Sequence, residues 1–280
     1  MVNKSEIESY IYPLAPIPTS LSPQGGIGTR IACILFDIYG TLFISGAGEP
    51  GLAGNKKHAY PKIQTIFIKY GVSADVAQMM GRLEARILSA HHDLKKQGVD
   101  YPEIRIEDIW MEMIGIDDPD TVRKFAVEFE LAVNPVFPMP HVKELLLALA
   151  AKNIILGIIS NAQFFTPYLF KWFLGGYPET LGFSSDLLFY SFQHGYAKPS
   201  EYLFTLALQK LREKQIEAQR ILYVGNDMRN DILPAQNSGM HTALFAGDRR
   251  SLRLRENDPC CRDLSADIIV TDLLQLLDHL

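Results

Sequence analysis

The sequence has few cysteines, no long apolar run and no marked excess of charge of either sign. Its three cysteines, Cys33 and the adjacent pair Cys260 and Cys261, make neither a disulfide framework nor a zinc-binding pattern. No stretch reaches the roughly 18 apolar residues of a membrane-spanning helix, and the first 20 residues lack the apolar core of a signal peptide. We therefore expect a cytoplasmic protein without a membrane partner.

The charged residues are nearly balanced, with 27 lysines and arginines against 32 aspartates and glutamates. The formal charge of −5 gives no general attraction for nucleic acid, so we expect no nucleic-acid partner. Hydrophobic residues make up 48% of the 280 residues, which is enough for one large core and a second, inserted unit.

Short apolar runs bounded by turn residues predict the strands of one sheet. The runs are residues 31–37, 154–160, 186–192, 220–225, 242–246 and 267–270. Helical patterns alternate with the later runs, at residues 141–153, 164–175, 200–214, 230–239 and 272–280. This alternation predicts an α/β fold with a parallel sheet covered on both faces, in which ligands bind beyond the carboxyl ends of the strands.

About 110 residues separate the first predicted strand from the next, far more than a simple crossover needs. The intervening segment is mainly helical in pattern and opens with a glycine-rich stretch at 45–54. We expect a core of residues 31–44 and 136–280 and a helical cap of residues 45–135, a common way to build a lid. Residues 1–30, which contain four prolines, predict an extended arm.

The first predicted strand ends in a lone carboxylate, Asp37, followed by Gly40 and Thr41. At that position Asp37 is placed to project into the crevice above the sheet, and Gly40 allows a sharp turn behind it. Because aspartate is ionised at pH 7, it can act as a nucleophile without a neighbouring base, with Thr41 as a candidate to orient it. A strand that simply ends in a capping aspartate is the alternative.

Two further strand ends carry candidate anion ligands. Ser160 and Asn161 come directly before a predicted helix, where a hydroxyl and backbone N–H groups can hold an anion. Lys198 stands before a proline and a helix, from where its ammonium could reach Asp37. Taken singly, a helix cap and a solvated lysine explain these residues equally well or better.

The fourth strand end carries two carboxylates, Asp227 and Asp231, four residues apart. Close to Asp37 they would repel one another, by about 4 kcal/mol at 4 Å with an effective dielectric constant of 20. A cation among them would remove this repulsion, and Mg²⁺ prefers oxygen ligands. Acidic residues at a helix N-terminus are the alternative.

Together these strand ends resemble the haloacid dehalogenase superfamily. FDIYGTLF, GIISNAQ, YAKPSEYLF and VGNDMRND are similar to its four motifs, and the likeness spans residues 31–247 with the cap in the expected place. The resemblance implies a Rossmann-like core, a helical cap and catalysis through a covalent intermediate on Asp37. It also implies that Ser160 and Lys198 bind the charge of the transferring group.

The same resemblance implies a Mg²⁺ site. Its ligands would be Asp37, the backbone carbonyl of Tyr39, and Asp227 or Asp231. Asn226 stands where many phosphatases of the family have their first acidic residue, so the register of the metal ligands stays open.

Tyr39 departs from the phosphatase pattern, in which an aspartate at this position acts as general acid and base. Protonating a leaving alkoxide is worth roughly 10² to 10⁴ in rate, whereas halide needs no proton. The 2-haloacid dehalogenases of the family have an Asp-x-Tyr-Gly-Thr motif like residues 37–41 and use no metal. In that interpretation Arg82 or Arg86 of the cap would receive the substrate carboxylate.

The paired carboxylates of the fourth motif favour the phosphatase side, because the dehalogenase branch has a single following aspartate there. We expect a Mg²⁺-dependent hydrolase of a small anionic, phosphorylated or phosphonate-type substrate. A metal-free 2-haloacid dehalogenase and a non-catalytic phosphate-binding homologue are the alternatives. The basic stretch RRSLRLR at 249–255 is interpreted as a surface loop.

Overall fold

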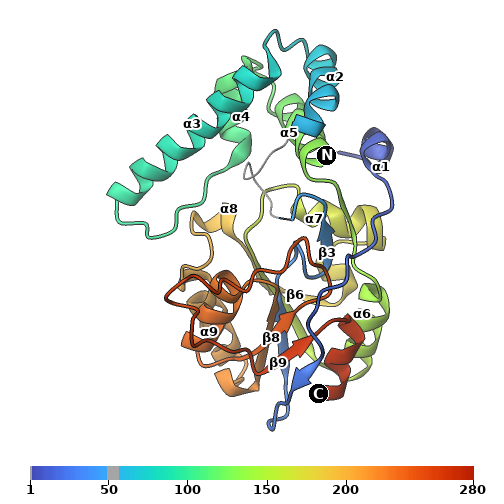
Figure 1. The fold of residues 1–280 in the computed structure, drawn as a ribbon, viewed down its shortest axis with the longest axis vertical. Helices are drawn as coiled ribbons and strands as arrows, with labels where there is room; N and C mark the ends of the chain where they lie inside the picture. Colours follow the sequence, from blue (N-terminus) through green and yellow to red (C-terminus); the bar gives the residue numbers. More distant parts are fainter. Residues whose placement is uncertain (1, 49–56) are drawn as a thin grey trace.

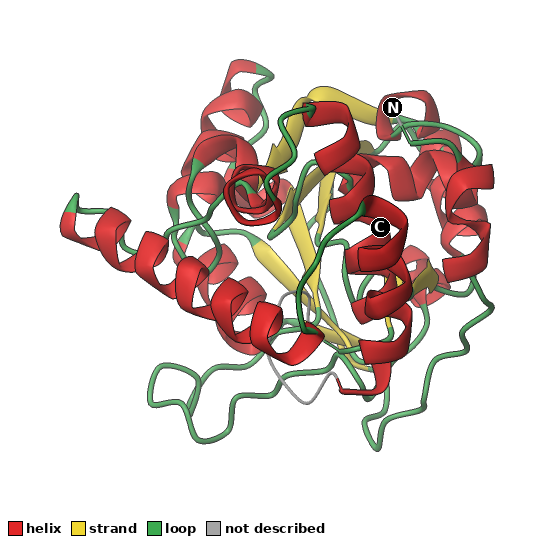
Figure 2. Cartoon of the chain, turned by 90° about the horizontal axis from the view of Figure 1, so that it is seen from above, coloured by secondary structure: helices red, strands yellow, loops and turns green. Residues whose placement is uncertain are grey.

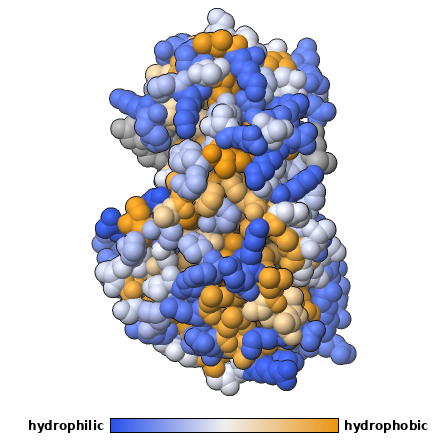
Figure 3. Space-filling model, turned by 90° about the vertical axis from the view of Figure 1, so that its right-hand side faces the viewer, coloured by the Kyte–Doolittle hydropathy of each residue, from blue (hydrophilic) through white to orange (hydrophobic). Residues whose placement is uncertain are grey.

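The computed structural model describes residues 2–48 and 57–280, which form two lobes (Figure 1). One lobe is helical and the other is built on a sheet, and a narrower waist joins them in the space-filling view (Figure 3). Residues 49–54 of the glycine-rich stretch lie outside the described residues. Within the described ranges no helix combines the length and the apolar character needed to cross a membrane.

The core sheet has seven strands in the order β1-β9-β8-β7-β2-β5-β6. All neighbouring strands are parallel except β1, which runs antiparallel to β9. The strands are β1 (Gln24–Gly25), β2 (Cys33–Phe36), β5 (Ile155–Ser160), β6 (Phe183–Tyr190), β7 (Ile221–Gly225), β8 (His241–Phe245) and β9 (Ile268–Val270). The six runs predicted from the sequence are all strands, and the predicted parallel α/β sheet is confirmed.

Strand β2 lies in the middle of the sheet, between β5 and β7, and all four of its residues are buried. A parallel strand covered on both faces reads as a continuous apolar run, which explains why CILF shows no alternation. Ile34 and Phe36 belong to one hydrophobic cluster, whereas Cys33 and Leu35 belong to another on the opposite face. The chain emerging from β2 therefore places Asp37 at the centre of the sheet edge.

Helices cover both faces of the sheet (Figure 2). They are α6 (Val142–Ala151), α7 (Thr166–Leu169), α8 (Ser191–His194), α9 (Tyr202–Glu213), α10 (Leu233–Asn237) and the 3₁₀-helix η7 (Leu273–His279). Two of the predicted helices include π-helical turns, η3 (Phe170–Leu174) after α7 and η6 (Met228–Ile232) before α10. The alternation of strands and helices predicted from the sequence is present.

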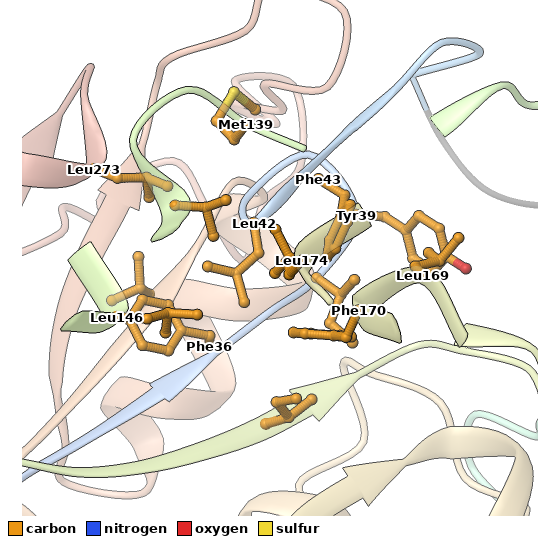
Figure 4. Close-up of a cluster of buried hydrophobic side chains, with 14 of the residues drawn as sticks. Phe36, Tyr39, Leu42, Phe43, Met139, Leu146, Leu169, Phe170, Leu174 and Leu273 are labelled. Carbon is orange, nitrogen blue, oxygen red and sulfur yellow. The ribbon is translucent and has the colours of Figure 1, made fainter. Parts of the chain in front are cut away.

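The larger core cluster packs the turn after β2 against α6, α7 and η3 (Figure 4). Phe36 lies beside Leu146 of α6, and the Phe43 and Phe170 rings meet edge to face at 5.1 Å. The ring of Tyr39 belongs to the same cluster. Packing of this kind fixes the backbone on which Asp37 is carried.

The helical lobe consists mainly of four helices with a separate apolar core. They are α2 (Tyr60–Tyr70), α3 (Val76–Lys96), α4 (Ile106–Ile114) and α5 (Pro119–Val133), preceded by the 3₁₀-helix η2 (Lys57–Ala59). Trp110 is 1% exposed, and its ring contacts Phe125 and Phe129 at centroid distances of 4.9 and 4.6 Å. Two short antiparallel strands, β3 (Phe43–Ser45) and β4 (Val136–Pro138), pair where the chain passes between the lobes.

The start of the chain differs from the extended arm that its prolines predict. It forms α1 (Lys4–Ile7) and the 3₁₀-helix η1 (Glu8–Tyr10), and Ile7 is fully buried. The indole of Trp172 donates to the Val2 carbonyl at 3.3 Å, and Tyr10 donates to Glu128 of α5 at 3.1 Å. The apolar side chains of the first ten residues find partners in both lobes, which composition alone could not indicate.

Candidate active site

A cavity of about 520 Å³ lies between the two lobes, at the carboxyl ends of the central strands. Its sheet-side wall includes Asp37 and Lys198. The wall formed by the helical lobe is largely apolar, with Leu83 of α3, Trp110 of α4 and Phe129 of α5. A largely apolar lining with a small group of polar side chains is the usual arrangement of a small-molecule site.

Lys198 is the centre of the group of polar side chains on the sheet side of the cavity. Its side chain is 3% exposed, and its ammonium donates to Asp37 Oδ1 at 2.8 Å, to Asp231 Oδ1 at 2.5 Å and to the Tyr223 hydroxyl at 2.9 Å. These three bonds use all the donors that an ammonium has. Burial by itself would lower the pKa of Lys198, but the carboxylates of Asp231 and Asp37 raise it. Lys198 therefore stays charged between two carboxylates.

Asn161 holds Lys198 in place. Its Oδ1 accepts from the Lys198 backbone N–H at 2.6 Å, and its Nδ2 donates to the Lys198 carbonyl at 3.1 Å. Asn161 also lines the cavity, but Ser160 is fully buried and is not among the lining residues. The Ser160 hydroxyl has one long contact, of 3.4 Å, to the Asn161 carbonyl. Of the two candidate anion ligands in the second motif, Asn161 lines the cavity and Ser160 does not.

Tyr39 is held by the core. Its hydroxyl lies 3.0 Å from the hydroxyl of Thr166, and its ring packs in the apolar cluster of Figure 4. Burial raises the pKa of the Tyr39 phenol well above its usual value. The side chain two residues after Asp37 is thus a neutral phenol bound to a core hydroxyl.

Asp231 is fully enclosed by donors. Its Oδ2 accepts from the backbone N–H groups of Asn226 and Asp227, at 2.9 and 3.0 Å, while Oδ1 faces Lys198. Burial raises the pKa of Asp231 to about 6, against the opposing effect of Lys198. Its carboxylate lies so close to Gly225 that any Cβ there would overlap it. The glycine that ends β7 is needed for this contact.

Asp227 forms an ion pair with Arg255, which was not among the candidate site residues predicted from the sequence. Its Oδ1 accepts from the backbone N–H groups of Arg229 and Asn230, at 2.9 and 3.2 Å, which caps the turn η6. The guanidinium of Arg255 holds the same carboxylate, with Nη2 2.5 Å from Oδ2 and Nε 3.1 Å from Oδ1. Both oxygens of Asp227 are therefore engaged by the protein.

From the sequence, a metal ion was expected because Asp37, Asp227 and Asp231 would repel one another. That argument is wrong, because cationic side chains of the protein relieve the repulsion. Lys198 lies between Asp37 and Asp231, and Arg255 neutralises Asp227. Among the described residues no group of three or more histidine, cysteine, aspartate or glutamate side chains is arranged to hold a metal.

The oxygens that still fit Mg²⁺ are those of Asp37 and Asn226. In the described part of the chain no hydrogen bond is made to Asp37 Oδ2. Asn226 Nδ2 donates to the Ser251 carbonyl at 2.6 Å, which turns its Oδ1 toward the Thr41 hydroxyl, 3.1 Å away. Mg²⁺ commonly uses one or two carboxylates together with substrate phosphate oxygens, so this donor set suits it, whereas Asp227 does not fit in this conformation.

Thr41 acts on Asn226 and not on Asp37. It is fully buried, and its hydroxyl donates to the Asn226 side chain. The expectation that Thr41 holds the nucleophile is therefore corrected: it links the loop after β2 to the loop after β7. The neighbouring Gly40 has φ 81° and lies so close to the Asn226 amide that a Cβ would be 2.8 Å from its nitrogen.

The structure does not bring the predicted cap arginines to the cavity. Helix α3 turns Leu83, Ile87 and His91 toward it, and neither Arg82 nor Arg86 lines it. Arg86 instead forms a two-pronged pair with Glu112 of α4, at 2.8 and 3.1 Å. The face that a cap helix presents depends on how the helix packs, which spacing along the sequence does not fix.

Arg253 and Arg255 are the lining cations that sequence reasoning missed. They belong to the basic stretch 249–255, which was interpreted as a surface loop. A signal was available, because this stretch directly follows β8, whose carboxyl end lies on the same sheet edge as that of β2.

The cap is joined to the core beside the cavity by Gln163. Its Nε2 donates to the carbonyl of Ile104 at 2.9 Å and to Glu103 Oε1 at 3.1 Å, and its Oε1 accepts from the Ile106 N–H at 3.0 Å. Glu103 Oε2 accepts from Ser191 at 2.7 Å. Burial raises the pKa of Glu103, which also lines the cavity. These bonds hold the α3–α4 connection of the cap over the ends of β5 and β6.

An α/β sheet with an aspartate at the end of its central strand and a buried lysine beside it defines a class of hydrolases. The family model of the haloacid dehalogenase-like hydrolases matches residues 31–239. This chain belongs to that family, as its four motifs indicate.

A curated relative is similar over part of the chain. The ribulose-1,5-bisphosphate 5-phosphatase of Halopiger xanaduensis is 32% identical over 102 residues, which are 36% of this chain. The match covers 41% of that protein, less than half of its length.

Solved structures share the fold at low sequence identity. The 2-haloacid dehalogenase of Pseudomonas syringae matches with a TM-score of 0.56 and 20% identity, covering 89% of this chain and 97% of that one. A HAD phosphatase of Thermococcus onnurineus matches with a TM-score of 0.53 and 18% identity, covering 89% and 97%. Dehalogenases and phosphatases thus share this architecture.

Proposed function

We propose that this hydrolase acts on small phosphorylated compounds, with the Asp37 carboxylate as nucleophile. The observation that carries the proposal is the position of Asp37 in the cavity, with Oδ1 bound to the buried ammonium of Lys198. A cation beside a nucleophilic carboxylate suits a phosphoryl group, whose negative charge would otherwise repel the attacking oxygen. The partial likeness to a phosphatase agrees with this choice.

In the first step an oxygen of Asp37 attacks phosphorus, and the bond from phosphorus to the leaving oxygen breaks with its electron pair. In the second step water attacks phosphorus, and the bond to Asp37 breaks, which releases inorganic phosphate and restores the carboxylate. Lys198 orients Asp37 in both steps, and Asn161 keeps Lys198 in position.

Mg²⁺ would be held by Asp37, the backbone carbonyl of Tyr39 and Asn226, and when bound it would neutralise charge on the phosphoryl oxygens. In this proposal Asp231 acts through Lys198 and is not itself a ligand. Because Tyr39 is a neutral phenol bound to Thr166, the best substrates have leaving groups that need little protonation, such as activated phosphates or phosphonate-type compounds.

Dehalogenation is the second candidate. It is favoured by Tyr39 in place of a general acid, by the apolar cap wall, and by the fact that protein cations already balance the carboxylates. Here Asp37 would attack carbon, and the carbon–halogen bond would break with the electron pair leaving on halide, which needs no proton. Water would then hydrolyse the ester at Asp37.

Parallel assays with p-nitrophenyl phosphate and 2-chloropropionate, each with EDTA or with added Mg²⁺, separate the candidates. The proposal expects aryl phosphate hydrolysis that EDTA abolishes and Mg²⁺ restores. Chloride release that is insensitive to EDTA would replace it with dehalogenation. Phosphate binding without either product would make the chain a non-catalytic phosphate-binding homologue. The Asp37→Asn variant serves as the background control in every arm.

A further inference from the structure

We propose that the arginine segment, residues 249–255, binds a second anionic group of the substrate. This inference rests on the proposed function and narrows the substrate class to small phosphorylated compounds that carry another phosphate or a carboxylate. The segment follows β8 and supplies both Arg253 and Arg255 to the cavity that contains Asp37.

A second, more open cavity of about 850 Å³ adjoins the first. It is lined by Arg229, Arg249, Arg253 and Arg255, together with two acidic residues, Glu256 and Asp258. Arg253 and Arg255 line both cavities, so the two cavities are neighbours on either side of these side chains. In this proposal one small molecule spans both, with a phosphoryl group at Asp37 and its second anion in the second cavity.

The arginine segment is fixed to the fourth motif. The N–H of Arg253 donates to the Asn226 carbonyl at 2.9 Å, and the N–H of Met228 donates to the Arg253 carbonyl at 2.9 Å. Asn226 also donates to the Ser251 carbonyl. These bonds place the arginines in register with the loop that carries Asn226 and Asp227, so their guanidinium groups are already positioned for a ligand.

The guanidinium of Arg253 is oriented by its own segment. Its Nη1 donates to the carbonyls of Arg250 and Leu252, at 2.7 and 3.0 Å. Arg250 instead forms an ion pair with Asp248, which is 1% exposed. Arg250 therefore stabilises the loop. Of the four arginines that line the second cavity, Arg229 pairs with Asp258 and Arg255 pairs with Asp227. Planar guanidinium groups bind phosphate and carboxylate oxygens in pairs.

The test compares substrates with one and two anionic groups. The kcat/KM of the full-length protein is measured with phenyl phosphate, with 4-carboxyphenyl phosphate and with hydroquinone bisphosphate, in low salt with Mg²⁺; all three release a phenolate, which needs little protonation. For the wild type we expect kcat/KM to be at least about tenfold higher for one or both of the two-anion substrates, because a hydrogen bond to a charged group is worth this much or more. The carboxyphenyl phosphate and the bisphosphate distinguish a carboxylate from a phosphate as the second group.

Arg253→Gln should lower the ratio of two-anion to one-anion kcat/KM by about ten- to hundredfold, the effect of losing one charged hydrogen bond. Arg249→Gln, which changes an exposed side chain and spares the folded loop, should lower the same ratio in the same direction. Arg212→Gln on α9, an exposed arginine that lines neither cavity, is the matched control and should leave the ratio unchanged.

A wild type without preference for two-anion substrates would overturn the inference, and so would Arg249→Gln with an unchanged ratio. Failure of the proposed function looks different, because the wild type would then hydrolyse none of the three compounds. In that case calorimetric titration with propane-1,3-bisphosphonate decides the matter. Binding that Arg249→Gln weakens supports the anion site, and equal binding by Arg249→Gln and Arg212→Gln rejects it.

Discussion

The hydroxyl of Tyr39 lies 3.0 Å from the hydroxyl of Thr166, and both residues are buried. Thr166 also accepts from the Gln163 N–H at 3.1 Å, so Tyr39 is tied to the segment that follows β5. The position two residues after Asp37 therefore supports packing between the loop after β2 and α7. In the proposed function, leaving-group protonation then comes from another group, or the substrate does not need it.

Asp37→Asn should abolish turnover, with a loss on the order of 10⁴-fold or more, as expected when a nucleophile is removed. The fold should persist, because Lys198 keeps its bonds to Asp231 and Tyr223. Initial rates with the substrate established for the wild type measure the first effect, and circular dichroism measures the second. Asp93→Asn on the exposed face of α3 is the control. A variant that keeps a tenth of the wild-type rate would remove Asp37 as nucleophile.

Lys198→Met should lower the free energy of unfolding by about 3–5 kcal/mol at pH 7, because it leaves two buried carboxylates without their cation. The deficit should shrink as the pH falls, since protonation removes the charge of Asp231, whose pKa burial already raises to about 6. Urea unfolding at several pH values measures this. Lys210→Met breaks only an exposed pair with Glu213 and should change the free energy by less than about 1 kcal/mol. Similar losses for both variants would contradict the central role of Lys198.

Glu103→Gln should flatten the pH dependence of stability. Burial raises the pKa of Glu103 in the folded protein above its ordinary value of 4.5, so its contribution to stability is full below that value and is lost as the pH rises through the folded pKa. The wild type should lose stability relative to the variant across that window. Denaturant midpoints between about pH 4 and pH 8 measure the difference. The exposed Glu84→Gln variant is the reference. If stability changes with pH in the same way for the wild type and Glu103→Gln, the contribution of Glu103 is rejected.

Trp110→Ala should lower the free energy of unfolding by about 3–5 kcal/mol, because it empties the centre of the cap core between Phe125 and Phe129. The chain has two tryptophans, and Trp172 belongs to the sheet-side core. Trp172 fluorescence can therefore follow unfolding of the sheet-side core in the variant. Leu88→Ala, which changes a side chain that is 61% exposed, should be nearly neutral. A loss below about 1 kcal/mol for Trp110→Ala would show that the cap core is not tightly packed.

The parallel sheet formed by the six apolar runs, and the place of the four motifs at strand ends, could be predicted from the sequence. Apolar runs such as CILF have to be buried on both faces, and parallel strands place their carboxyl ends on one edge. Asp37 and Lys198 are therefore brought together by rules that depend only on local pattern and topology. Their contact, at 2.8 Å, agrees with the sequence argument.

Tertiary structure decided which charges meet. Asp227 turned out to be the partner of Arg255, and Lys198 lies between Asp37 and Asp231, so neither Asp227 nor Asp231 is left as the expected metal ligand in this conformation. These pairings depend on the directions of long side chains from loops far apart in the sequence, which respond to packing and burial that no spacing encodes. For the same reason the sequence pointed to Arg82 and Arg86, whereas the fold brought Arg253 and Arg255 to the cavity.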